Sequence, residues 1–181
     1  MVRFLEQDQL RGKVGRYLVW GGAAVLLALP LLAMQFTDEV DWTGADFIVM
    51  GLMLLLACTA YEIAAFVARS NAYMVAAALA VGGGFLTIWA NLAVGIIGHE
   101  GNPANDLFFG VVAFALVAAL LALFRARGMA WAMLATAVVQ LAVGVYAWWA
   151  GHGLVFVFTG VMCALWLTSA RLFHRAARQA A

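Results

Sequence analysis

Six long apolar stretches, separated by short polar connections, dominate the pattern of hydrophobic and polar positions along the chain. They cover residues 17–34, 46–68, 73–98, 107–124, 129–150 and 154–173. The hydrocarbon core of a bilayer is about 30 Å thick, and a helix needs about 20 mostly apolar residues to cross it. The pattern therefore predicts an all-α fold, a polytopic membrane helix bundle with six transmembrane helices.

The composition agrees with lipid as the solvent of this chain. Of its 181 residues, 67% are hydrophobic and 10% are charged, and the mean hydropathy is +1.00. Soluble domains carry about 25% charged residues. No polar stretch is long enough to form a second domain, so we expect one bundle over residues 17–173. A cytoplasmic segment, residues 1–16, precedes this bundle, and a cytoplasmic tail, residues 174–181, follows it.

The N-terminal segment does not have the pattern of a cleaved signal peptide. The first apolar run, residues 17–34, is longer than the usual hydrophobic region of about 7–15 residues, and no small-x-small cleavage site follows it. An uncleaved first span is expected. Apolar residues recur at helical spacing at Leu10, Val14, Tyr17 and Leu18, with basic residues between them. This pattern fits a short interfacial helix on an anionic leaflet, and a solvated leader fits equally well.

All ten Lys and Arg residues fall on one side of the expected topology, in residues 1–16, 69–71, 125–128 and 171–178. Six of the nine acids lie in the connections on the opposite side. Because Lys and Arg in short loops stay on the cytoplasmic side, both termini are expected in the cytoplasm. The net charge of +1 gives no indication of a nucleic-acid partner. Cys58 and Cys163 lie within apolar runs and are expected to be buried small hydrophobic residues, with no disulfide between them.

Two sequence features bear on how the helices pack. The second and fourth spans open similarly, and the third and fifth both end in Gly-His, which suggests a tandem helical-hairpin repeat. Chance similarity between Ala-, Val- and Leu-rich segments is the alternative. Residues 82–84 are three consecutive glycines inside the third span, which mark a close helix crossing, a kink or a hinge. A close crossing is the favoured interpretation.

Glu62 is the one acidic residue well inside an apolar run. A carboxylate inside the membrane is costly and is a functional hypothesis by default, so Glu62 is a candidate proton or cation site. Asn91 and Gln140 are the other large polar side chains in the spans and are candidate members of the same transport or relay path. The alternative for Glu62 is a structural ion pair near the inner interface with Arg69, two helical turns further on. Asn91 and Gln140 would then form hydrogen bonds between helices.

The connections opposite the basic side contain the candidate ligands for a metal. His99 and His152 are expected at similar depth at the ends of the third and fifth spans. Together with Glu100 they could bind zinc or another divalent ion, and the two histidines alone could clasp a haem. Solvated histidines are the simpler interpretation, so the cofactor stays unknown.

Helix caps explain much of the polar sequence in these same connections. Asn105 is expected to cap the fourth helix, and Thr43 or Asp41 the second. Asp46 would lie in the first turn of that second helix, where the helix dipole favours an anion. The acids at residues 38–41 could instead bind a hard cation through their oxygens.

No HExxH, GxSxG or P-loop motif is present, and no soluble domain is expected to hold a cofactor. The leading hypothesis is a non-enzymatic accessory or scaffold subunit. Its partners would be the lipid bilayer and other membrane proteins or copies of itself. The alternatives are a small ion- or proton-coupled transporter that uses Glu62, and an outer-face metal or haem binder that uses His99 and His152.

Four segments carry a resemblance to known sequences: residues 36–42 (FTDEVDW), 61–62 (YE), 91–98 (NLAVGIIG) and 102–105 (NPAN). They resemble segments of a family of small, uncharacterised bacterial inner-membrane proteins. The likeness covers the first four spans. It implies a location in a bacterial inner membrane and nothing about activity.

Overall fold

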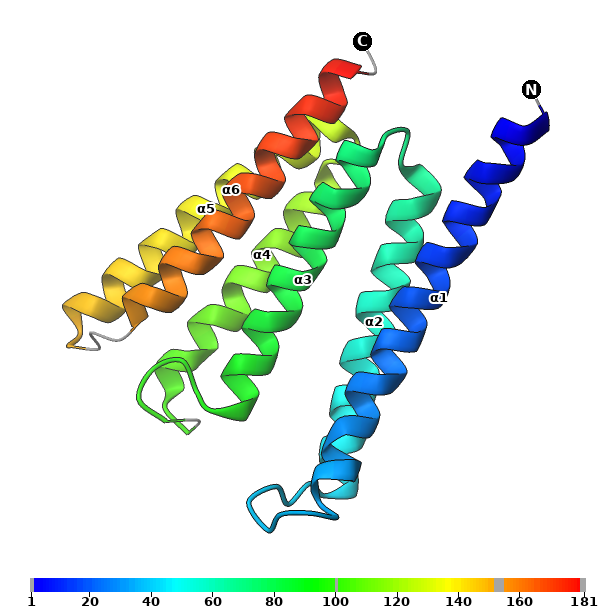
Figure 1. Ribbon diagram of the computed structural model, residues 1–181. Coiled ribbons are helices and arrows are strands. Elements are labelled where there is room, and N and C mark those ends of the chain that lie inside the picture. Colours follow the sequence, from blue (N-terminus) through cyan, green and yellow to red (C-terminus); the bar gives the residue numbers. More distant parts are fainter. Residues whose placement is uncertain (1, 100, 152–154, 180–181) are drawn as a thin grey trace. The chain divides into compact units, whose positions relative to one another are not determined.

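The computed structural model describes residues 2–99, 101–151 and 155–179, with side chains from residue 15 onward. Within these ranges the regular structure is entirely helical (Figure 1). The elements are α1 (Val2–Ala33), α2 (Gly44–Val67), α3 (Asn71–Ala93), the 3₁₀ turn η1 (Pro103–Asn105), α4 (Asp106–Leu121), α5 (Ala126–Trp149) and α6 (Val155–Gln179). Among the described residues, six helices are long and apolar enough to cross a membrane, which is consistent with an integral, multi-pass membrane protein.

Two helices end earlier than their apolar runs predicted. The third run continues to residue 98, but α3 ends at Ala93, and Gly95 and Gly98 follow with φ of 69° and 71°. The fourth run continues to residue 124, but α4 ends at Leu121. Leu123 and Phe124 then take φ of 49° and 55°, in the left-handed region that cannot continue a right-handed helix.

Helical structure also extends beyond the predicted spans at both ends of the chain. α1 begins at Val2, so the N-terminal segment is helical and continues directly into the first span, Gly15–Ala33. α6 continues past the predicted end at residue 173 to Gln179. Its last turns are Ala- and Arg-rich, and both residue types favour helix in water as well as in lipid.

The chain divides into two compact units, residues 1–62 and 63–181, which are described separately. The first, called the hairpin unit below, consists of α1 and most of α2, which run antiparallel (Figure 1). The Cys58 thiol lies 4.0 Å from the Val19 carbonyl oxygen, and a side chain at Gly51 would contact Leu27. Small residues on α2 thus let the two helices of the hairpin approach each other.

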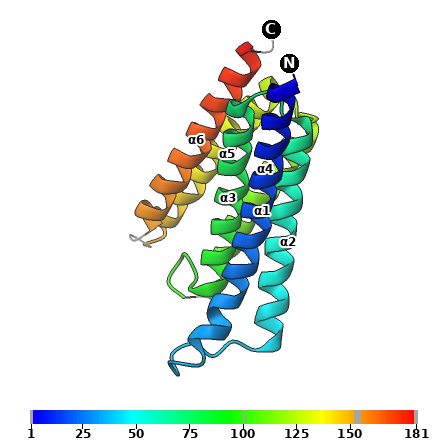
Figure 2. The same cartoon turned by 45° about the vertical axis from the view of Figure 1, so that its right-hand side comes forward.

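The second unit, called the four-helix unit below, contains α3, α4, α5 and α6. α6 packs against both α3 and α5, and α4 packs against the same two helices, so the four form a closed ring (Figures 1 and 2). Short connections between sequential neighbours give the ring an up-and-down topology. Trp166, Phe173 and Met133 are among its most deeply buried side chains.

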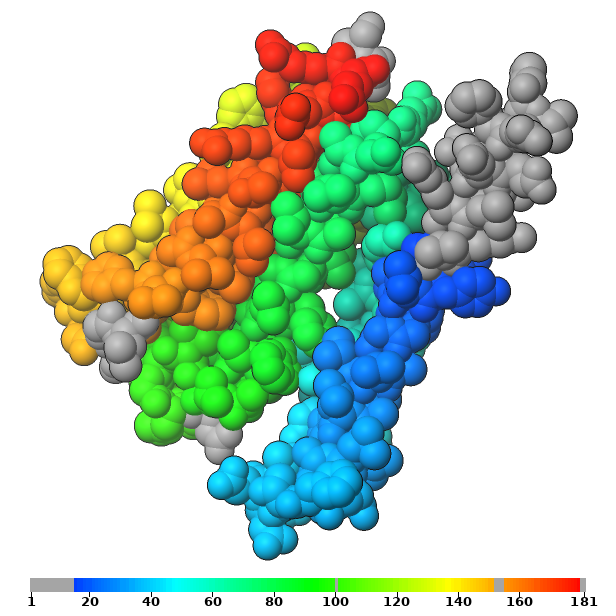
Figure 3. All heavy atoms as spheres, in the orientation of Figure 1, coloured from blue at the N-terminus to red at the C-terminus, as the bar shows by residue number. Residues whose placement is uncertain are grey.

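Small residues on α3 allow α6 to pack closely against it. A Cβ placed on Gly83 would lie 3.4 Å from the Trp166 ring, and the Ser169 hydroxyl donates a 2.8 Å hydrogen bond to the Ala76 carbonyl oxygen. The atoms of the two helices are in contact in the space-filling view (Figure 3). Of the triplet, Gly83 packs against α6 at ordinary van der Waals distance, Gly84 faces Val112 on α4, and a Cβ placed on Gly82 would meet no atom within 4 Å. α3 continues without interruption through these residues.

Both cysteines are free thiols, as expected. Cys58 is buried in the hairpin unit, and Cys163 is half-buried on α6, where its thiol lies 3.5 Å from the Ala137 carbonyl oxygen.

Candidate functional site

The Glu62 carboxylate is held by two side chains of α1. Arg16 donates from Nε to Glu62 Oε1 at 2.8 Å and from Nη2 to Oε2 at 2.7 Å. The indole Nε1 of Trp20 donates to Oε1 at 3.2 Å. Both oxygens of the carboxylate are thus engaged, in the forked geometry that arginine and carboxylate favour.

The helical repeat and the antiparallel hairpin together produce this arrangement. Arg16 and Trp20 are four residues apart and therefore lie on one face of α1, near the start of its span. Glu62 lies near the end of α2, so the hairpin brings it to the same end as Arg16. The side chain of Arg16 is 65% exposed and that of Glu62 is 25% exposed. The expected ion pair is therefore present, but its cation is Arg16 and not Arg69.

Asn91 belongs to a separate hydrogen-bond network at the far end of α3. Its amide nitrogen donates to the Asn105 carbonyl oxygen at 2.7 Å. Asn91 is buried and joins α3 to the turn η1, directly before α4. This contact is a hydrogen bond between elements, as one of the two interpretations of Asn91 expects.

Gln140 lies in the middle of α5 and is completely buried in the four-helix unit. Neither its amide oxygen nor its amide nitrogen has a hydrogen-bond partner among the described atoms. The buried Thr159 hydroxyl and the Trp166 indole nitrogen, both on α6, also have no hydrogen-bond partner among the described atoms. The structure therefore does not join Gln140 to Asn91, and Glu62 belongs to the other unit.

Asn105 organises the connection between α3 and α4. Its side-chain oxygen accepts from the Ile97 N–H at 2.7 Å, and its side-chain nitrogen donates to the His99 carbonyl oxygen at 2.8 Å. Asn105 occupies the N-cap position of α4, as expected, but its side chain makes no capping bond to that helix. The buried Asn105 amide instead forms hydrogen bonds to backbone groups of the preceding loop. These groups need such partners because they follow the end of α3 and are not paired within that helix.

Thr43 and Asp46 cap α2 reciprocally. The Thr43 N–H and hydroxyl each donate to Asp46 Oδ2 at 2.7 Å, and Asp46 N–H donates to Thr43 Oγ1 at 3.4 Å. This is the geometry of a capping box with aspartate at the third helical position. Of the two predicted caps, the Thr43 alternative is confirmed.

The candidate metal or haem ligands are only partly visible. His99 is exposed after the end of α3, and its ring nitrogen Nδ1 would lie 3.4 Å from a Cβ at Gly101. Glu100 and His152 lie outside the described residues. Within the described ranges, no group of three or more His, Cys, Asp or Glu side chains is placed to hold a metal ion.

Comparisons with protein-family models, curated proteins and solved structures return no match to this chain. Its function must therefore be argued from its own residues.

The contacts of Arg16 and Trp20 with Glu62 could have been predicted from the sequence. Arg16 and Trp20 share a helical face at the basic end of the first span, and Glu62 lies at the basic end of the second. Any antiparallel hairpin of these spans brings the three together. The bonds of Asn105, by contrast, depend on how the loop before it folds back, and no helical spacing indicates that path.

Proposed function

We propose that this chain is a non-enzymatic accessory or scaffold subunit of a bacterial inner membrane, with both termini in the cytoplasm. The placement of all ten Lys and Arg residues on one side supports the orientation. Residues 36–42, 91–98 and 102–105 resemble segments of small bacterial inner-membrane proteins, and this resemblance supports the proposed location. The tandem-hairpin repeat, and metal or haem binding at His99 and His152, stay predictions beside this proposal.

The observation that carries the proposal is the structural use of Glu62. A proton- or cation-coupled carrier needs a carboxylate that exchanges its ligand during transport. Here Arg16 and Trp20 occupy both oxygens of the one acidic side chain well inside an apolar run. Arg16 lies near the start of the first span and Glu62 near the end of α2, where long side chains reach the interface. Glu62 therefore acts as a clasp between α1 and α2, which favours a scaffold over a carrier.

A second observation concerns how such a scaffold binds its partner. Gly21 and Gly22 lie in the interior of α1, and within the hairpin unit no atom comes within 4 Å of a Cβ placed on either. Glycine lowers helix stability by about 1 kcal/mol relative to alanine, so two adjacent glycines need a compensating contact. In lipid, small residues of this kind let another transmembrane helix approach closely. The proposal assigns this face of α1 to another membrane protein or to a second copy of the chain.

Substitution of Glu62 separates the scaffold from the carrier. The wild-type chain and the Glu62→Gln variant are each reconstituted in vesicles, and proton and sodium flux are measured. We expect both proteins to give the same flux as empty vesicles. The same substitution should loosen the hairpin, and Arg16→Gln should do so equally because it breaks the same bonds. The readout is the cross-linking yield between a cysteine placed at Val19 and the native Cys58, whose thiol lies 4.0 Å from the Val19 carbonyl oxygen. A flux that the wild type supports and Glu62→Gln abolishes would overturn the scaffold assignment.

Cysteine cross-linking in native membranes tests the partner face. We expect Gly22→Cys to cross-link to another membrane protein or to a second copy. Ala24→Cys, two residues further on and therefore on nearly the opposite side of α1, is the matched control. Equal yields at both positions would show that the glycine face has no preferred partner.

A further inference from the structure

A cavity of about 350 Å³ opens in the four-helix unit at the end where α3 and α5 begin. The connection from α2 to α3 contributes Arg69 and Ser70 to its lining, and the connection from α4 to α5 contributes Phe124 and Arg125. These two connections are distant in sequence and belong to the basic side of the topology. The cavity is independent of the Glu62 clasp, which lies in the hairpin unit.

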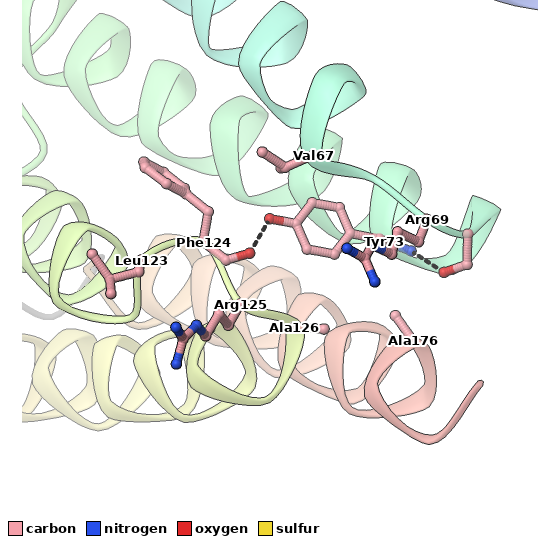
Figure 4. Close-up of a pocket in the computed structure, with 9 residues that line it drawn as sticks. Val67, Arg69, Tyr73, Leu123, Phe124, Arg125, Ala126 and Ala176 are labelled. Atoms are coloured by element: carbon pink, nitrogen blue, oxygen red, sulfur yellow. Dashed lines mark hydrogen bonds between the residues drawn. The ribbon is translucent and has the colours of Figure 1, made fainter. Parts of the chain in front are cut away.

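The charge of this cavity is entirely positive. No acidic residue lines it, and the one ion pair within the described ranges joins Arg16 to Glu62, so neither Arg69 nor Arg125 has a carboxylate partner there. Both side chains are exposed and therefore free to turn toward a ligand. Figure 4 shows their guanidinium groups on different sides of the Tyr73–Phe124 hydrogen bond. Two unpaired guanidinium groups beside a cavity form a strong attraction for a phosphate.

Backbone and hydroxyl donors add to this charge. α5 begins at Ala126, its N-cap is Arg125, and no side chain caps its first amides. The N-terminal end of a helix carries free N–H groups and a partial positive charge, both of which favour an anion. The Ser70 hydroxyl accepts from the Tyr73 N–H at 3.3 Å and retains its own proton for donation to a ligand.

The wall of the cavity is held in a strained conformation. Leu123 and Phe124 are consecutive non-glycine residues in the left-handed region, a conformation that persists only where its surroundings enforce it. The Tyr73 hydroxyl donates a 2.6 Å hydrogen bond to the Phe124 carbonyl oxygen (Figure 4). The Tyr73 ring packs edge-on against Phe173, with ring centroids 4.9 Å apart. The cavity is thus a formed feature that buried side chains support.

Apolar residues complete the lining, with Val67 and Ala176 beside the polar groups. The outer surface of α4 near the cavity is also apolar, since Leu120 and Leu121 are exposed. A ligand with a phosphate at one end and acyl chains at the other matches both surfaces, and basic pockets between transmembrane helices bind such headgroups. We propose that this cavity binds the phosphate group of an anionic phospholipid, through Arg69, Arg125, Ser70 and the first amides of α5.

Lipid binding by the purified full-length chain tests the proposal. Native mass spectrometry would count phosphatidylglycerol molecules retained after titration, with phosphatidylcholine as the neutral-headgroup reference. The titration is run in about 0.5 M salt, where the Debye length falls to a few Å and general surface attraction is screened. We expect the double variant Arg69→Gln/Arg125→Gln to bind phosphatidylglycerol on the order of tenfold more weakly, because its charge-assisted hydrogen bonds are lost.

Two further variants keep the result interpretable. Arg127→Gln/Arg171→Gln removes the same charge from positions that do not line the cavity, and it should bind like the wild type. Arg69→Lys/Arg125→Lys keeps the charge and the fold but loses the forked donors, so binding should be intermediate. Equal weakening in the Arg127/Arg171 variant, or no preference of the wild type for phosphatidylglycerol, would overturn the proposal.

A competition arm identifies the source of the phosphate. Excess inorganic phosphate should not displace the lipid if the acyl chains contribute through the apolar wall. Displacement that requires Arg69 and Arg125 would assign the same phosphate site to a free anion.

Discussion

Gly144 provides the sharpest test of how the four-helix unit packs. A Cβ placed on this residue of α5 would lie 2.5 Å from both Oγ1 and Cγ2 of Thr159 on α6, and 2.9 Å from its Cβ. Carbon atoms pack at about 3.5–4.0 Å, so Gly144→Ala requires the helices to separate by about 1 Å. A change of the Thr159 rotamer cannot relieve the clash, because its Cβ is also too close.

The magnitude follows from two opposing effects. Overpacking of a core costs about 1–3 kcal/mol, and the contact with a β-branched Cβ places Gly144→Ala at the upper end of that range. Alanine in place of glycine favours the helix by about 1 kcal/mol. We therefore expect a net loss of about 2 kcal/mol in the free energy of unfolding.

Gly160→Ala is the matched control, because Gly160 lies one residue beyond Thr159 on α6 and a Cβ placed there would meet no atom within 4 Å. Only the helix-propensity gain of about 1 kcal/mol applies there, so the two variants should differ by about 3 kcal/mol. Unfolding in mixed micelles with increasing SDS, followed by circular dichroism, measures both. If Gly144→Ala is as stable as Gly160→Ala, then α5 and α6 do not approach each other at Thr159 as described.

Two further substitutions examine the buried amides of the four-helix unit. Gln140→Met replaces an amide without a described partner by an apolar side chain of similar volume, so we expect a stabilisation of about 1–3 kcal/mol in the same unfolding assay; a loss of stability would show that the amide is satisfied. Asn105→Ala should cost about 2–3 kcal/mol because it leaves two backbone groups of the preceding loop unpaired, whereas Asn102→Ala removes one contact at a half-buried site and should cost about 1 kcal/mol. Equal losses would contradict the assigned role of Asn105.

Hydropathy was sufficient to predict the helices, but it could not predict where each one ends. In lipid every backbone group must be satisfied within the segment, so an apolar run of sufficient length forms a helix. The ends of α3 and α4 depend instead on single residues that turn left-handed. Gly95, which takes φ of 69° two residues after the end of α3, carries this signal in its identity. Leu123 and Phe124 do not, because their conformation is maintained by Tyr73 from a different part of the chain.

The candidate polar residues show the same division. Local spacing placed the cap of α2 at Thr43 or Asp41, and Thr43 forms it with a partner only three residues away. Asn105 was assigned by the same local reasoning to α4, but its side chain bonds backward to the loop. A bond from Asn105 to the first turn of α4 and a bond to the preceding loop are both local, and each pairs the same amide with backbone groups. Only the path of the loop decides between them, and that path depends on tertiary packing.

The case of Glu62 shows that position along the helix, and not membership of an apolar run, determines what a carboxylate in a span does. α2 ends at Val67, so Glu62 lies only about 7.5 Å along the axis from the end of its helix. An arginine on the adjacent helix spans such a distance with its aliphatic stem while its head stays at the interface. The 65% exposure of Arg16 agrees with a head at that level. A carboxylate at this depth needs no transport role to account for its presence, whereas Gln140, at the centre of α5 and without a described partner, does require an explanation.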